Sequence, residues 1–152
     1  MKLTILAIGR ARAGPEKTLF DDYLKRLPWP VELKEMEVKK ALPPAEKQKR
    51  ESALLLAAVP DGAVVVALDE FGKDIGSAGL AKRLGHWQDE GRRDVAFLIG
   101  GADGHADDVT QRADLTLAMG RMTWPHMLAR VMLAEQLYRA WSILTGHPYH
   151  RA

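Results

Sequence analysis

Apolar and polar residues are grouped into blocks that alternate along the chain. Apolar runs cover residues 2–8, 63–69, 94–101 and 114–119, and a further run begins near Val31. The segments between and after them have a helical period and cover residues 15–27, 43–59, 77–90, 105–113 and 125–144. Unbroken apolar runs such as AVVVALD are typical of strands buried on both faces. Five strands alternating with five helices predict an α/β fold, with a mostly parallel sheet flanked by helices on both faces.

Proline, serine and glycine set the expected ends of the helices. Pro15 and Pro125 suit the first turn of a helix, where the missing N–H has no partner to lose. Ser77 leads the helix that follows the third strand. Gly146 is expected to end the last helix, and Pro148 cannot extend it.

The composition is that of a single domain spanning residues 1–152. Hydrophobic residues make up 47% of the chain and charged residues 28%, which argues against disorder. Cysteine is absent, so disulfides and thiolate chemistry are excluded. The apolar run at the N-terminus is too short to span a membrane, and basic residues follow it instead of a cleavage site. We therefore expect a cytoplasmic protein.

Charge alone does not point to nucleic acid. The net charge is +2, although residues 115–152 hold four arginines, three histidines and a single acid, Glu135. A solvated basic tail is the simpler and normally the better explanation. His147 and His150 flank a Pro-Tyr pair, but no third ligand has a suitable spacing, so we expect no metal site.

Three loops are the natural place to look for a ligand site. In parallel sheets, ligands bind beyond the carboxyl ends of the strands, which here lie at residues 68–70, 99–101 and 119–121. Two successive glycines, Gly100 and Gly101, favour either a close approach of a ligand to the backbone or a tight turn with positive φ.

The sequence lacks the common nucleotide-binding and nucleophile motifs. Gly9 and Gly14 have the spacing of a P-loop, but Pro15 stands where the loop needs its lysine. Neither a G-x-G-x-x-G fingerprint nor a G-x-S-x-G elbow occurs in the chain.

The last helix lacks a polar face in its first half. From Met127 to Ala134 the only charged residue is Arg130, which lies one turn from His126. One sheet covers only one side of such a helix. We expect a second copy of the chain to cover the other side and form a homodimer; the alternative is a helix at the centre of the core.

The motifs ALDEFGK, FLIGGADG and MTWPHMLARVMLAEQLYRAWSILTGHPYHRA carry a resemblance to a known family. The chain resembles, along essentially its whole length, the small SPOUT-class ribosomal RNA methyltransferases that methylate N3 of a pseudouridine in large-subunit rRNA. The C-terminal third is the most specific part, with MT-aromatic-PH followed by EQLYRA and PYH.

This resemblance implies a fold with a deep C-terminal trefoil knot, an exception to the rule that chains do not thread loops. It implies S-adenosylmethionine (SAM) as cofactor, and a homodimer whose sites combine the cofactor of one subunit with the tail of the other. The implied cofactor-binding residues are Leu68, Gly100, Met119, Gly120, Arg121, Met122, Thr123 and Trp124. Gly120 departs from the serine that is more usual in relatives, which removes a hydroxyl contact and leaves a backbone contact intact.

The implied reaction needs a group that handles the proton of the N3 imide or the charge that develops beside it. His126, Tyr149 and His150 are the candidates, and Arg139 is a candidate for neutralising charge or holding a phosphate. His126 is equally well explained as a structural histidine at a helix start.

Two other functions stay open at this point. One is a dimeric SAM sensor without catalysis, which has no need of the PYHR tail. The other is methylation of a different RNA, but many such enzymes carry an added RNA-binding domain, and this chain has none. We therefore expect large-subunit rRNA, within the assembled ribosome, as the partner, with no membrane and no metal.

Overall fold

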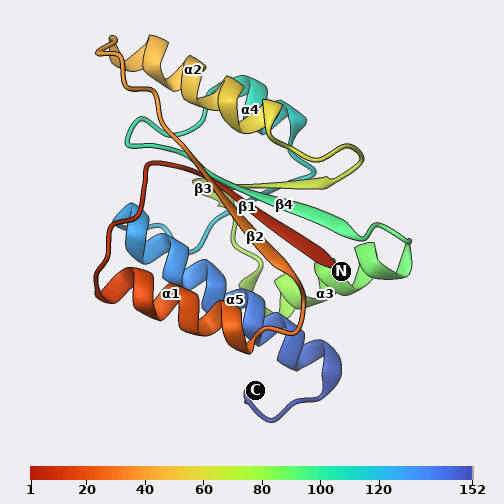
Figure 1. The fold of residues 1–152 in the computed structure, drawn as a ribbon. Coiled ribbons are helices and arrows are strands. Elements are labelled where there is room, and N and C mark those ends of the chain that lie inside the picture. Colours follow the sequence, from red (N-terminus) through yellow and green to blue (C-terminus); the bar gives the residue numbers. More distant parts are fainter. Residues whose placement is uncertain (152) are drawn as a thin grey trace.

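The computed structural model describes residues 1–151 and shows a central sheet between two layers of helices (Figure 1). The five strands are β1 (Lys2–Ile8), β2 (Val31–Met36), β3 (Val64–Lys73), β4 (Asp94–Ile99) and β5 (Leu115–Leu117). They lie in the order β2-β1-β4-β3-β5, and every neighbouring pair is parallel. The predicted parallel α/β sheet is confirmed.

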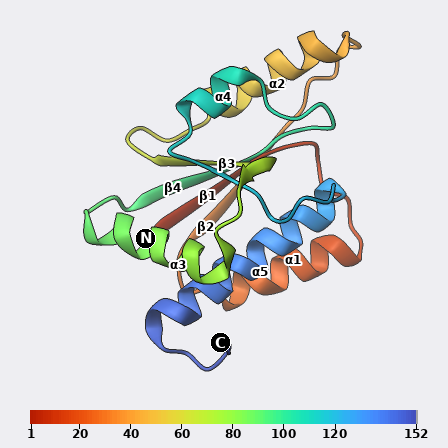
Figure 2. The ribbon, with the colours of Figure 1, turned by 180° about the vertical axis from the view of Figure 1, so that it is seen from behind.

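Helices cover both faces of the sheet, as the view from behind also shows (Figure 2). One layer holds α1 (Pro15–Arg26), α3 (Gly76–Asp89) and α5 (His126–Thr145), and the other holds α2 (Pro44–Ala57) and α4 (Asp107–Arg112). Both α1 and α3 pack against α5, which is therefore the middle helix of its layer.

Alternate residues of β1 supply the cores on the two faces. Leu3, Ile5 and Ala7 pack in the core beneath α1, α3 and α5, whereas Leu6 and Ile8 pack beneath α2 and α4. Successive side chains of a strand point to opposite faces, so a continuous apolar run is what a doubly covered strand requires.

Two elements differ from their predicted form. β3 runs on to Lys73, because residues 69–72 bulge outward before Lys73 rejoins β5. The prediction that Ser77 leads α3 is wrong: the helix begins at Gly76 and has no side-chain cap. The Ser77 hydroxyl instead donates to Oε1 of Gln136 at 2.7 Å, which ties α3 to α5.

The ends of α5 follow the predicted residues closely. Pro125 immediately precedes the helix, and its carbonyl accepts the first helical hydrogen bond from the N–H of Ala129 at 2.9 Å. Gly146 ends the helix with a φ of 74°, a left-handed conformation that glycine adopts without steric cost.

Arg130 fixes the first half of α5 against the sheet. Its side chain is almost fully buried, forms an ion pair with Glu35 of β2 and donates to the Gly9 carbonyl at 2.9 Å. Glu35 also accepts from the N–H of Ala11 at 2.6 Å. Burial alone would raise the pKa of Glu35, but the hydrogen bonds from Arg130 and Ala11 outweigh it and hold that pKa below its ordinary value.

We predict that Glu35→Gln lowers the free energy of unfolding at pH 7 by about 3 kcal/mol, because it leaves a buried guanidinium without its counter-ion. Urea unfolding of both proteins measures this difference. The folded pKa of Glu35 is depressed, so its contribution is complete above the unfolded pKa and is lost as pH falls through the folded pKa. The gap between the two proteins should therefore shrink in acid, and a gap that is independent of pH would contradict this account.

Candidate functional site

The carboxyl ends of β4, β3 and β5 meet at one edge because these strands are neighbours in the sheet. The loops that follow them enclose a cavity of about 400 Å³. Its lining includes the residues Leu68, Gly100, Met119, Gly120, Met122, Thr123, Trp124 and His126. Arg121, which the resemblance placed with them, is exposed and does not line the cavity.

Neither Gly100 nor Gly101 adopts a positive φ. Their lack of a side chain is instead needed for close packing. A Cβ on Gly100 would lie 3.2 Å from the carbonyl of Gly104. A Cβ on Gly101 would lie 2.8 Å from Oε1 of Glu51. The loop backbone is therefore pressed against other parts of the protein while it also forms a wall of the cavity.

The loop between β5 and α5 is held at several points. The indole N–H of Trp124 donates to the Met119 carbonyl at 2.9 Å, and the Thr123 hydroxyl donates to Oε2 of Glu70 at 3.0 Å. Gly120 has a φ of 93°, a conformation that L-residues with a Cβ rarely adopt. This turn gives a physical reason for glycine at the position where the family resemblance led us to expect serine.

His105 is a largely buried imidazole in the cavity wall. Its Nε2 lies 3.2 Å from the Leu98 carbonyl, and its Nδ1 is buried without a hydrogen-bond partner among residues 1–151. Burial lowers the pKa of His105 and outweighs the effect of the hydrogen bond. The ring is therefore neutral at pH 7, with its hydrogen on Nε2 directed to the carbonyl.

The charge around the cavity is negative. Asp69, Glu70 and Asp103 line it, and no lysine or arginine of the described chain does so. Glu51 is buried behind Gly101, and burial raises the pKa of this carboxyl. Carboxylates in a partly closed cavity favour a ligand that carries positive charge.

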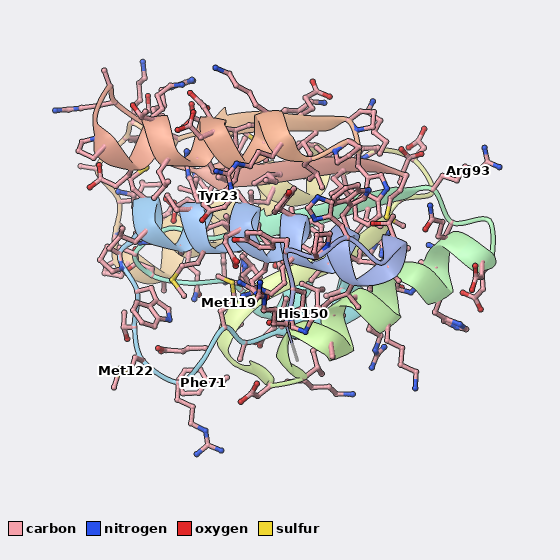
Figure 3. All side chains as sticks on the ribbon, turned by 90° about the horizontal axis from the view of Figure 1, so that it is seen from below. Tyr23, Phe71, Arg93, Met119, Met122 and His150 are labelled. Carbon is pink, nitrogen blue, oxygen red and sulfur yellow. The ribbon has the colours of Figure 1, made fainter. Side chains whose placement is uncertain are left out.

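Arg139, Tyr149 and His150 form a second cluster, where the tail folds back onto the second half of α5. Figure 3 labels His150 of this tail. Arg139 pairs with Oε1 of Glu135 at 2.6 Å, and the Tyr149 hydroxyl donates to the same oxygen at 2.9 Å. Nη1 of Arg139 lies 3.2 Å from Nδ1 of His150. A guanidinium only donates, so Nδ1 of His150 is the acceptor in this contact.

Tyr149 is packed onto its own helix. Its ring meets Tyr138 edge-on with centroids 4.6 Å apart, and the Arg139 guanidinium lies 5.0 Å from its centroid. Burial, together with hydrogen bonds to Tyr23 and Glu135, raises the pKa of the Tyr149 phenol well above its usual value. Tyr149 therefore keeps its proton at neutral pH and serves as a hydrogen-bond donor, not as a base.

The predicted catalytic residues thus lie in two places within one protomer. His126 lines the cavity, whereas Arg139, Tyr149 and His150 do not. His126 and Arg139 are thirteen residues apart on one continuous helix, or about 20 Å at 1.5 Å per residue. One chain cannot bring the two groups together without breaking α5.

Several lining residues were not singled out from the sequence: Gln48, Phe71, His105 and Ala129. Gln48 reaches the cavity from α2, where it donates to the carbonyls of Asp103 and His105, a tertiary contact with no local signal. His105 was taken as the start of a helix, but α4 begins only at Asp107 and leaves His105 in the loop.

The part of the chain that the structure describes, residues 1–151, has no helix long and apolar enough to cross a bilayer. The same residues contain no group of three histidines or acids placed to hold a metal ion.

Comparison with known proteins defines the class to which this fold and cavity belong. Residues 1–150 match the family model described as "Predicted SPOUT methyltransferase". The chain therefore belongs to the SPOUT methyltransferase family.

Individual relatives are more specific. The ribosomal RNA large subunit methyltransferase H of Paramagnetospirillum magneticum is 62% identical over 151 residues, which cover 99% of each chain. The protein of the same name from Rhodospirillum centenum is 58% identical over the full length of both. A solved structure of "a probable methylase family protein" from Haemophilus influenzae has a TM-score of 0.61 at 9% identity. It covers 99% of this chain and 70% of that one, and it shows likeness of fold alone.

We predict that Gly101→Ala destabilises the protein by about 1 kcal/mol, because the buried Glu51 carboxyl at the end of its side chain must shift to make room for the methyl group. The control is a double-mutant cycle with Glu51→Ala, measured by urea unfolding. Once the carboxyl is removed, the same glycine substitution should cost far less. Equal costs in both backgrounds would show that Glu51 does not set the requirement for glycine.

Proposed function

We propose that the protein is a SAM-dependent methyltransferase that methylates N3 of a pseudouridine in large-subunit ribosomal RNA. The observation that supports it most directly is full-length similarity to relatives named ribosomal RNA large subunit methyltransferase H. The motifs of the C-terminal third point to the same substrate. Because this substrate is part of the ribosome, the proposal includes action in the cytoplasm and, with the family, a trefoil knot in the C-terminal part.

The cavity suits SAM in size and charge. Its volume of about 400 Å³ lies within the range of small-molecule sites. SAM carries a sulfonium, and the lining offers the carboxylates of Asp69, Glu70 and Asp103 without a competing lysine or arginine. Leu68, Gly100 and the loop of residues 119–124 would hold it.

A homodimer through α5 is the second part of the proposal. The outward side of this helix keeps Leu128 43% exposed and leaves Met127 and Met132 half-buried, so an apolar strip remains to be covered. Apolar surface on a helix of this kind is typical of a two-fold interface. The charge of Arg130 is already neutralised by Glu35 within the protomer.

The dimer would also complete the site. SAM supplies a methyl group bound to a positively charged sulfur, and a nucleophile in line with that group accepts it. Arg139, with its pKa raised by the hydrogen bond to Glu135, stays charged and suits an imide losing its proton or a phosphate. The Tyr149 hydroxyl, whose proton already goes to Glu135, would help to hold Glu135 and Arg139 in place, and His150 or His126 would take the proton. Arg139, Tyr149 and His150 would come from the second subunit, because none of them lines the cavity of its own chain and Arg139 lies about 20 Å along α5 from His126.

A methyl-labelling experiment tests the reaction. We expect the purified protein to transfer labelled methyl from SAM to large subunits or whole ribosomes that lack the modification, at N3 of one pseudouridine. Mass spectrometry of the digested rRNA identifies the product. Transfer to another position or to transfer RNA alone, or no transfer, would overturn the proposed substrate.

The variant Ala129→Trp tests the cavity. Ala129 lines it from α5, and an indole there would occupy part of its volume. We expect calorimetry to show SAM affinity reduced by more than about tenfold, equivalent to about 1.4 kcal/mol. Ala78→Trp, on the exposed side of α3, is the matched control and should bind as the wild type does.

Mixed dimers test the shared site. One chain carries Ala129→Trp and the other lacks residues 150–152, and each alone should be inactive. After coexpression, half of the dimers would be mixed and each would hold one complete site, so we expect about a quarter of wild-type activity. If each chain used its own tail, mixing would restore nothing, and the composite site would be wrong.

A further inference from the structure

Phe71 has an almost fully exposed aromatic ring beside the cavity. It is 89% exposed, the largest exposure among the large hydrophobic residues of the described chain. Met122, 74% exposed, lines the same cavity from the loop after β5. Both side chains project from one edge of the molecule, with Met119 further in (Figure 3). Single exposed apolar side chains are common on protein surfaces. The exposure of Phe71 therefore indicates a function only if the backbone holds the ring beside the cavity.

The backbone that presents Phe71 is fixed at several points. Leu68 and Lys73 both pair with Leu117 of β5, so the four residues between them are forced outward as a bulge. The N–H of Phe71 donates to Oδ1 of Asp69 at 2.8 Å. A Cβ on Gly72 would lie 2.6 Å from the carbonyl oxygen of Thr116, so this glycine lets the bulge lie flat on β5.

The bulge is also bound to the loop that carries Met122. Oε2 of Glu70 accepts from the hydroxyl of Thr123 at 3.0 Å, one residue before Phe71 and one after Met122. The two exposed side chains are therefore held at a set distance from each other across the mouth of the cavity. Bulges often re-aim a side chain next to an active site.

The surroundings indicate which kind of partner fits. Glu70, Lys73 and Asp74 flank the ring and are exposed, so the apolar area is small and its border is charged. Two side chains are far too few for a stable protein interface, and the apolar strip of α5 is a different surface. The flanking charges are of both signs, with Lys73 beside Glu70 and Asp74 and with Arg121 next to Met122 in the chain, so they favour neither a phosphate nor a cation at the ring itself. The partner that fits this small apolar area is a single flat, uncharged group. That group must also reach the cavity where the methyl donor would lie.

We propose that Phe71, supported by Met122, is the platform on which the target base of the RNA stacks when it leaves its own strand to reach the cavity. This rests on the proposed function. A base inside a folded RNA must be turned out before a ring nitrogen can be methylated, and an aromatic face replaces the stacking that the base gives up. Phe71 is thus a substrate-positioning residue with no part in holding SAM.

The test compares Phe71→Ala with Phe71→Trp and with Leu54→Ala, a matched control on the opposite helical layer. Methyl transfer is measured against the concentration of unmodified large subunits. We expect Phe71→Ala to lower kcat/KM by between about 5-fold and 150-fold, the equivalent of the roughly 1–3 kcal/mol of one base–aromatic stack. Phe71→Trp should keep a kcat/KM close to that of the wild type, and Leu54→Ala should have the wild-type kcat/KM.

Three further readouts exclude other roles of the ring. SAM affinity by calorimetry should be unchanged in Phe71→Ala, and a loss would show that the ring covers the cofactor instead. Sedimentation should give the wild-type oligomer, and dissociation would assign the patch to a second copy of the chain. The slope of log affinity for RNA against log salt should stay constant, because no phosphate contact is removed; a shallower slope would overturn base stacking.

The proposal and the function on which it rests fail in different ways. If the wild type transfers no methyl group to ribosomal RNA, the proposed function is wrong. If the wild type is active and Phe71→Ala has the same kcat/KM, only the platform is wrong.

Discussion

The parallel pairing of β4, β3 and β5 is the constraint on which the site depends. Because these three strands are adjacent, three chain segments that are distant in sequence end at one edge of the sheet. The backbone of Gly72 lies so close to β5 that a Cβ would be 2.6 Å from the Thr116 carbonyl oxygen, and a Cβ on Gly100 would be 3.2 Å from the Gly104 carbonyl. The cavity is therefore a product of tight backbone packing, and the polar side chains around it, such as Asp69 and His105, are placed by that packing.

The continuous helix α5 divides the remaining chemistry between two places. It begins at the cavity with His126 and carries Arg139 on its second half, where Tyr149 and His150 of the tail fold back onto it. Along this helix His126 and Arg139 are about 20 Å apart, so each protomer presents a cofactor-sized cavity at the start of α5 and the cluster of Arg139, Tyr149 and His150 on its second half. In two copies packed through the apolar strip of α5, the cluster of each copy would complete the cavity of the other. This is the physical reason for connecting the proposed dimer with the proposed reaction.

Much of this fold can be read from the sequence because its signals are local. Apolar runs and helical periods place all five strands and all five helices, and Gly146 marks the end of α5. The tertiary contacts have no such signal. The hydroxyl of Ser77 looks like a helix cap but bonds Gln136, and Gln48 reaches the cavity from the opposite helical layer. The tail looks like a free terminus, yet Tyr149 packs on Tyr138 and bonds Glu135.

The same limit applies to the candidate site. The three strand-end loops are predictable, because parallel sheets bind ligands there. The resemblance adds the individual residues of the loop at 119–124, of which Arg121 lies outside the cavity lining. Neither the strand-end rule nor the family resemblance predicts the position of Phe71. That position depends on a bulge between Leu68 and Lys73, which both pair with Leu117 of β5.

The buried charge of α5 links stability to the geometry of the cavity. Arg130 lies one helical turn after His126, and its contacts with Glu35 and the Gly9 carbonyl hold the start of α5 against the sheet. The loop that precedes the helix contributes Trp124, whose indole bonds Met119 across the turn at Gly120. An apolar residue in place of Arg130 could fill the space, but it would not fix the helix to two specific acceptors on β2 and the loop after β1. The ion pair thus gives a defined direction to the helix start, and the position of His126 at the cavity wall follows from it.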